Sequence, residues 1–89
     1  MLDISQAVVR RYAWLMEKNQ AERADAAVIK YYTAETYKAI ADTCLQILGG
    51  YGHCMEYPMQ RFHRDAWLAT IGGGTSEIQK NIIASTFGL

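Results

Sequence analysis

The sequence is short of several features that mark particular classes of protein. Its 89 residues contain one proline and two cysteines, and nine basic residues balance nine acidic ones. Cys44 and Cys54 are too few for a disulfide framework, so we expect a reduced, cytoplasmic protein. A net charge of zero offers no basic stripe for nucleic acid or for an anionic membrane. We therefore expect neither of these as a partner.

Long apolar runs are absent as well. A bilayer-spanning helix needs about 20 apolar residues in succession, and no stretch approaches that length. The first residues, Met1–Ser5, lack the basic region and apolar core of a signal peptide. We expect no membrane span and no signal peptide, and we expect residues 1–89 to form a single helical domain.

Apolar residues are nevertheless abundant. They make up 51% of the chain and include six tyrosines, two tryptophans and four methionines. A domain of this size buries only about 60% of the surface of its unfolded chain. We therefore expect part of the apolar surface to meet another chain, and we expect the protein to self-associate through its helices.

The spacing of apolar residues predicts an all-α fold. They recur every three or four positions over residues 3 to 18, which indicates an amphipathic helix. Residues 21 to 48 contain no glycine or proline and predict one long helix of roughly 40 Å. On that helix Ala27, Ala34 and Ala41 stand seven positions apart, so another helix can approach closely there. We expect this alanine seam to take part in self-association.

Two shorter helices are expected after the long one. Pro58 suits the first position of a helix that ends near Thr70. Thr75 or Ser76 can cap a last helix, and Ser76 with Gln79 three positions later fits a capping box. The sequence therefore predicts an antiparallel, four-helix bundle-like domain, complete or in part.

Two glycine clusters interrupt this helical sequence. The first is Gly49–Gly52 and the second is Gly72–Gly74, which Thr75 and Ser76 follow directly. A glycine-rich turn that leads into a helix binds anions, because its amides and the helix dipole both favour negative charge. The second cluster has this form, although a tight turn without any ligand would have the same sequence. It is neither a P-loop, because no lysine follows the last glycine, nor a dinucleotide fingerprint, because no strand precedes it.

Other patterns of reactive residues are less informative. The tripeptide His63–Asp65 copies three letters of the kinase catalytic loop but lacks the asparagine that should follow. Glu56 and Glu77 are the carboxylates nearest to the glycine clusters and could serve as a catalytic base. Glu77 is also favourable near a helix start for structural reasons alone. No metal site is expected, because the histidines and cysteines lack the spacing of zinc ligands: Cys44, His53, Cys54 and His63.

Three blocks of the sequence resemble the C-terminal signature of the acyl-CoA dehydrogenase family. The family pattern reads approximately Q-x-x-G-G-x-G, E-Y-P-x-x-R-x-x-R-D-A and I-x-x-G-T-x-E-I-Q. The match is strong over residues 44–86, whereas residues 1–43 match only as two long helices, the second with Lys30 near its start. The blocks are Gln46–Gly52 (QILGGYG), Glu56–Ala66 (EYPMQRFHRDA) and Ile71–Ala84 (IGGGTSEIQKNIIA).

The resemblance implies the C-terminal helical domain of an FAD-dependent enzyme that forms the α,β double bond of acyl-CoA thioesters. In such enzymes a carboxylate removes the α proton and flavin N5 takes the β hydride. A homo-oligomer, either dimer or tetramer, is also implied, with the mitochondrial matrix as its location if the source is eukaryotic. The implied cofactor contacts are Gln46, Gly49 and Gly50 toward the FAD of a neighbouring subunit, and Gly74, Thr75 and Glu77 toward the FAD of the same subunit.

One position departs from the family pattern. Many members carry the catalytic glutamate two residues before the threonine, and here Gly73 stands in that place. The resemblance therefore implies no catalytic residue at the turn, as in branches whose base comes from an earlier helix. Two functions stay open: a contribution to a complete acyl-CoA dehydrogenase, or a noncatalytic helical assembly module derived from that family. We do not expect the 89 residues alone to be a competent dehydrogenase.

Overall fold

The computed structural model describes residues 1–89, which form five helices and no strand. Four of the helices have ten or more residues, and the fifth is a single turn. In chain order they are α1 (Leu2–Glu17), α2 (Arg23–Leu48), α3 (Gly50–His53), α4 (Met59–Ala69) and α5 (Ser76–Ser85).

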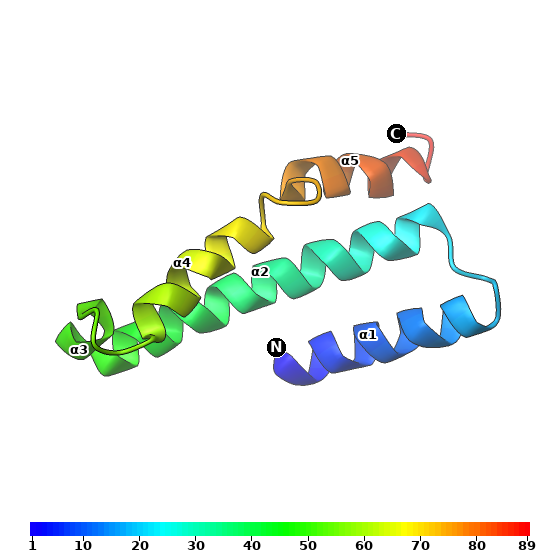
Figure 1. The fold of residues 1–89 in the computed structure, drawn as a ribbon. Coiled ribbons are helices and arrows are strands. Elements are labelled where there is room, and N and C mark those ends of the chain that lie inside the picture. The colour runs from blue at the N-terminus through cyan, green and yellow to red at the C-terminus, as the bar shows by residue number, and fades with distance from the viewer.

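The long helix α2 is the axis of the molecule. Helix α1 runs antiparallel along one side of it, while α4 and α5 follow one another end to end along the other side (Figure 1). Because α1 contacts neither α4 nor α5, the helices do not close around a common core, and the molecule extends over 46 × 25 × 17 Å. The predicted all-α class and the antiparallel packing of neighbours are confirmed, and the bundle is open.

The alanine seam of α2 is covered by the rest of the chain. Ala27, Ala34 and Ala41 are only 3%, 6% and 3% exposed. A side chain of one methyl group lets a neighbouring helix come near, as the spacing predicts. The seam is therefore used inside the chain. Our expectation that it takes part in pairing two chains is wrong.

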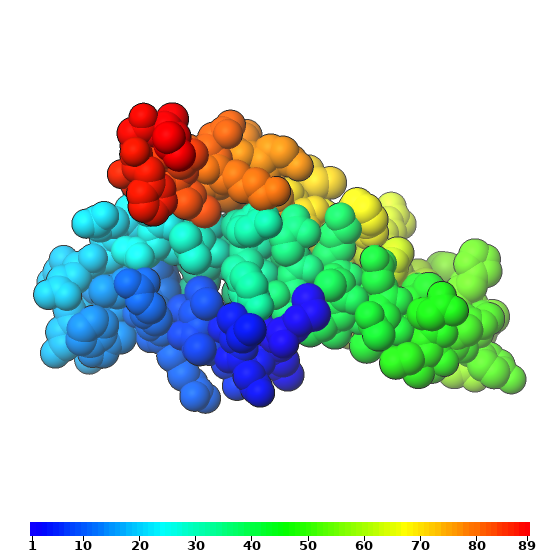
Figure 2. Space-filling view, turned by 180° about the vertical axis from the view of Figure 1, so that it is seen from behind, coloured from blue at the N-terminus to red at the C-terminus, as the bar shows by residue number.

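Large apolar side chains are exposed in other places. Only ten of the 89 residues are buried, and no large side chain is fully buried. Figure 2 shows that the end of the molecule with α3 projects beyond α1. Ile47 and Met55 near that end are 77% and 79% exposed. None of the five helices combines the length and the hydropathy that a bilayer crossing requires.

The start of the last helix differs in part from the prediction. Thr75 caps α5, because its Oγ1 accepts a hydrogen bond from the amide of Ile78 over 3.2 Å. The alternative capping box of Ser76 and Gln79 is wrong. The Ser76 hydroxyl donates to a carboxylate on α2, and the Gln79 amide donates to the carbonyl of Gly73.

The sequence does not predict the helical turn α3. Gly49, with φ +59°, ends α2, and the chain then turns at once into α3. Gly52 lies so close to α2 that a Cβ atom there would be 2.8 Å from the carbonyl oxygen of Leu45. The first glycine cluster therefore folds this segment back against the end of the helix that precedes it.

Asp25 links α1 to α2 and provides a test of the fold by pH. Its carboxylate accepts from the backbone amide of Glu22 over 2.9 Å and from Arg11 Nη1 over 3.1 Å, which lowers its pKa below the usual 3.8. Because the pKa is lower in the folded state, this contribution to stability is complete above pH 3.8 and is lost as the pH falls below that value.

We expect Asp25→Asn to flatten the fall in unfolding free energy below pH 3.8, measured by urea unfolding across a series of pH values. Arg11→Met removes the hydrogen bond from Arg11 to Asp25 and should flatten this fall in unfolding free energy to a smaller extent. Arg10→Met is the matched control, because Arg10 makes no ion pair. An acid slope in Asp25→Asn equal to that of the unmodified protein would contradict this account.

Candidate functional site

The second glycine cluster lies against the middle of α2 and is bound there by Lys30. The ammonium group of Lys30 donates to the carbonyl of Ala69 over 2.8 Å and to the carbonyl of Gly74 over 2.6 Å. Ala69 is the last residue of α4, and Gly74 belongs to the turn before α5. One side chain of α2 thus holds the end of one helix and the approach to the next.

A second side chain of α2 holds the start of α5. The hydroxyl of Ser76 donates to Glu35 Oε1 over 2.6 Å, and Ser76 is only 5% exposed. The backbone amide of Ser76 donates to the carbonyl of Thr70, which follows α4 directly, over 3.1 Å. Ser76 therefore ties α5 both to α2 and to the end of α4.

Gln79 binds the turn from within α5. Its side-chain amide donates to the carbonyl of Gly73 over 3.2 Å, and the residue is 7% exposed. Gly74 allows this contact, because a Cβ atom at that position would collide with Gln79 Nε2. The φ angle of Gly74 is +100°, which residues with a side chain rarely adopt.

Several backbone amides of the turn are left without a partner in the chain. The amides of Gly73, Gly74, Thr75 and Glu77 make no hydrogen bond, whereas that of Ser76 is bonded. Three of these four residues are the ones predicted to contact a cofactor. Free amides at a helix start can bind an anionic group, because the positive end of the helix dipole lies at the same place.

A pocket of about 210 Å³ opens beside two of these residues, Thr75 and Glu77. One wall is a cation–π contact, with Lys38 Nζ 3.5 Å from the centre of the Trp67 ring. The pocket combines two carboxylates, one ammonium group, an aromatic ring and hydroxyl groups, so its lining suits a polar ligand with a flat ring. Its principal lining residues are Glu35, Lys38, Trp67, Thr75, Ser76 and Glu77.

The first glycine cluster lies far from this turn. Gln46, Gly49 and Gly50 are exposed at the end of α2. Glu35, which contacts the start of α5, and Gly49 are fourteen positions apart, or roughly 21 Å along the helix axis. The structure therefore gathers the six predicted cofactor residues into two groups of three, and it does not bring the two groups together.

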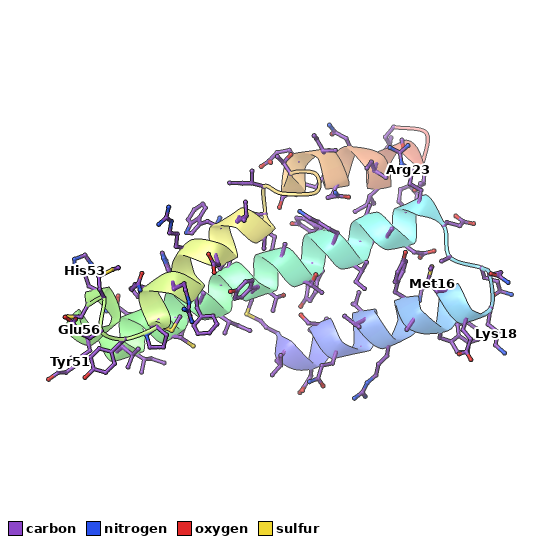
Figure 3. The ribbon with its side chains drawn as sticks, viewed as in Figure 1. Met16, Lys18, Arg23, Tyr51, His53 and Glu56 are labelled. Atoms are coloured by element: carbon purple, nitrogen blue, oxygen red, sulfur yellow. The ribbon has the colours of Figure 1, made fainter.

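Aromatic and polar side chains surround the first glycine cluster. Tyr51, His53 and Glu56 point outward at the end of the molecule formed by α3 (Figure 3). The rings of Tyr51 and Tyr57 meet edge to face, with centres 5.5 Å apart. This end of the molecule is an exposed surface rather than an enclosed pocket.

The structure places the two candidate bases differently. Glu56 lies at the α3 end, and Glu77 is exposed in the first turn of α5. A Cβ atom at Gly73 would meet nothing within 4 Å, so the place of the family glutamate has room but no side chain. His63 contacts Asp42 over 2.6 Å, and no group of three or more potential metal ligands lies together.

Sequence reasoning missed the two residues that hold the turn. Lys30 was noticed only as part of a family resemblance, and Glu35 was not considered. Their partners lie 39 to 44 positions later in the sequence: Ala69 and Gly74 for Lys30, and Ser76 for Glu35. Single charged residues on a helix are common at solvated positions, so no local signal marks these two.

Comparisons with known proteins found one family and several similar proteins. Residues 1–87 match the family described as the acyl-CoA dehydrogenase C-terminal domain. Benzylmalonyl-CoA dehydrogenase of Aromatoleum aromaticum is 42% identical over 83 residues, covering 93% of this chain and 22% of that protein. The mitochondrial long-chain specific acyl-CoA dehydrogenase of Sus scrofa is 38% identical over 81 residues, covering 91% and 19%. A 3-(aryl)acrylate reductase of Clostridium sporogenes is 36% identical over 84 residues, covering 94% and 22%.

The chain spans about a fifth of the length of these curated relatives. A solved structure from a study of the electron transferring flavoprotein of Acidaminococcus fermentans and flavin-based electron bifurcation superposes with a TM-score of 0.90. It is 24% identical, and the match covers 96% of this chain and 22% of that one. This similarity supports the fold.

Proposed function

Since this chain belongs to the acyl-CoA dehydrogenase family through its C-terminal domain, we propose that it contributes cofactor contacts and helix packing to an FAD-dependent acyl-CoA dehydrogenase. The observation that carries the proposal is the turn Gly72–Glu77. Its free amides include those of Gly74, Thr75 and Glu77, the positions that the family resemblance assigns to FAD.

The residues of this turn fit an anionic, partly aromatic cofactor. Free backbone amides supply hydrogen-bond donors for a phosphate or for the polar edge of a flavin. The absence of side chains at Gly73 and Gly74 lets a ligand approach the backbone closely. FAD, when bound, supplies the two-electron acceptor for the reaction. The chain's own part is to hold and orient it through Gly74, Thr75 and Glu77.

The proposed substrates are acyl-CoA thioesters, in which the enzyme forms the α,β double bond. Two relatives are named as dehydrogenases of such compounds, one for benzylmalonyl-CoA and one for long-chain acyl-CoA. Because Gly73 has no side chain to remove the α proton, the base in this proposal is a carboxylate outside these 89 residues.

The α3 end is proposed as a subunit contact. Gln46, Gly49 and Gly50 are exposed there, beside the exposed side chains of Ile47 and Met55. An apolar surface of this kind is stabilised by contact with another protein. We propose a homo-oligomer, a dimer or a tetramer, in which this end meets the FAD of a neighbouring subunit. Its location in the cytoplasm or in the mitochondrial matrix stays a prediction.

The test is to purify the protein at its natural length and titrate it with FAD, following flavin fluorescence. We expect saturable binding, followed by bleaching of the flavin absorbance when acyl-CoA thioesters are added without oxygen. A series of straight-chain, branched and arylalkyl thioesters would define the acyl group. Light scattering on the same preparation gives the oligomeric state.

Two results would redirect the proposal. Failure to bind FAD at concentrations of about 100 μM, well above typical cofactor dissociation constants, would contradict it. Binding of FAD without bleaching by any thioester would favour the noncatalytic assembly module, for which the glycine at position 73 is the motivating observation.

A further inference from the structure

Lys30 and Glu35 lie on α2 beneath the junction of α4 and α5, where they contact both sides of the glycine turn. We infer that these two residues act together as positioning residues: they fix the turn Gly72–Glu77 so that its free amides face the cofactor in one arrangement. The inference deepens the proposed function, and its consequence for FAD rests on that function.

Lys30 places a positive charge at the end of α4. Its ammonium group lies at the carbonyl of Ala69, the last residue of α4. The C-terminal end of a helix carries a partial negative charge from its unpaired carbonyls, so a cation there is stabilising. The same ammonium group also donates to the carbonyl of Gly74, so it joins the end of α4 to the turn.

Glu35 places the opposite charge at the start of α5. Its carboxylate accepts from Ser76, the first residue of α5. The N-terminal end of a helix carries a partial positive charge, so an anion there is stabilising. Helix α2 thus places a cation at the negative end of α4 and an anion at the positive end of α5.

Helix α2 sets the distance between these two contacts. Lys30 and Glu35 are five positions apart, which corresponds to roughly 7.5 Å along α2. Helices α4 and α5 do not pack against each other, although each packs on α2. Their relative position is therefore set through α2 and through the bonds of the short turn. Moving either charged side chain would change where the amides of Gly74 and Thr75 lie.

The other lysines that face neighbouring helices do not have this arrangement. Lys38 lies over the ring of Trp67, and Lys80 lies 5.2 Å from the ring of Tyr31. Neither donates to a backbone carbonyl. Among these three lysines, Lys30 alone donates hydrogen bonds to two carbonyls across the junction of α4 and α5.

The test compares Lys30→Met and Glu35→Ala with Lys18→Met, a matched control at an exposed lysine without contacts. Hydrogen exchange is followed at the amides of Ser76 and Ile78, which are bonded only while the turn keeps its shape. We expect exchange at both amides to rise at least about tenfold in the two test variants, as local opening becomes easier.

The dissociation constant of FAD and the visible circular dichroism of the bound flavin are measured at a temperature well below unfolding. We expect the dissociation constant to rise roughly tenfold, since less of the protein is preorganised for binding. Glu35→Gln keeps an oxygen that can accept from Ser76, so it should restore most of the exchange protection. If Glu35→Ala fails to fold, Glu35→Gln replaces it as the test of the Glu35 carboxylate.

The outcomes separate the two proposals. Exchange in Lys30→Met equal to that in Lys18→Met would overturn the inference. Faster exchange with unchanged FAD affinity and dichroism would also overturn it, because the two residues would then stabilise the fold without orienting the cofactor contacts. If the unmodified protein does not bind FAD, the proposed function fails, while the exchange rates still decide whether Lys30 and Glu35 fix the turn.

Discussion

Replacing Gly74 with alanine is expected to lower the free energy of unfolding by about 3 kcal/mol and to abolish retention of FAD during purification. The new methyl group would collide with Gln79 Nε2, which donates to the carbonyl of Gly73. At φ +100° the alanine would also be strained in its backbone. The measurements are urea unfolding and the ratio of flavin to protein absorbance.

The matched control is Gly73→Ala, one residue earlier in the same turn. Gly73 also has a positive φ, +70°, but a Cβ atom there would meet nothing within 4 Å. We expect it to cost about 1 kcal/mol, the ordinary penalty for a left-handed alanine, and to leave some FAD bound. Equal losses in the two variants would show that strain alone, and not the contact with Gln79, sets the requirement for glycine at position 74.

The second large effect is expected for Gly52→Ala, at the other glycine cluster. Its methyl group would lie 2.8 Å from the carbonyl oxygen of Leu45, and the backbone of α2 cannot move aside easily. We expect a loss of about 2 kcal/mol in unfolding free energy, with displacement of α3. If the α3 end is a subunit contact, light scattering should also show a smaller assembly.

Gly50→Ala provides the comparison for this site. Gly50 lies in the same helical turn, has no positive φ, and a Cβ atom there would meet nothing within 4 Å. The substitution is expected to be neutral or to stabilise the protein by about 0.5 kcal/mol, since alanine restricts the unfolded chain. A loss in Gly50→Ala as large as that in Gly52→Ala would contradict the steric explanation.

The sequence was informative where local chemistry decides the structure. Seven-residue spacing of Ala27, Ala34 and Ala41 correctly indicated close helix packing, and glycine clusters correctly marked the ends of α2 and α4. Thr75 was one of two predicted caps, and the threonine hydroxyl fulfils that role. In each case the determining interactions lie within a few residues of one another.

The rest of the structure depends on contacts between distant residues. Lys30 and Glu35 meet partners about 40 positions later, and nothing near them in the sequence identifies those partners. Helix α3 was missed because glycine has a low helix propensity, which packing against α2 overcomes. The alanine seam was assigned to pairing between two chains, whereas it is buried within one chain. The spacing of the alanines indicates that this face of the helix is covered, but it does not identify the element that covers it.

The continuous helix between Glu35 and Gly49 has a consequence for how this protein tolerates changes in length. Each residue inserted there would advance the α3 end by 1.5 Å and rotate it by about 100° relative to the turn held by Glu35. A single insertion would thus point Gln46 and the first glycine cluster toward a different side of the molecule. An insertion of about seven residues would nearly restore the helical phase, but it would lengthen the separation by roughly 10 Å. Variation in length should therefore accumulate in the connections between helices and be excluded from this half of α2.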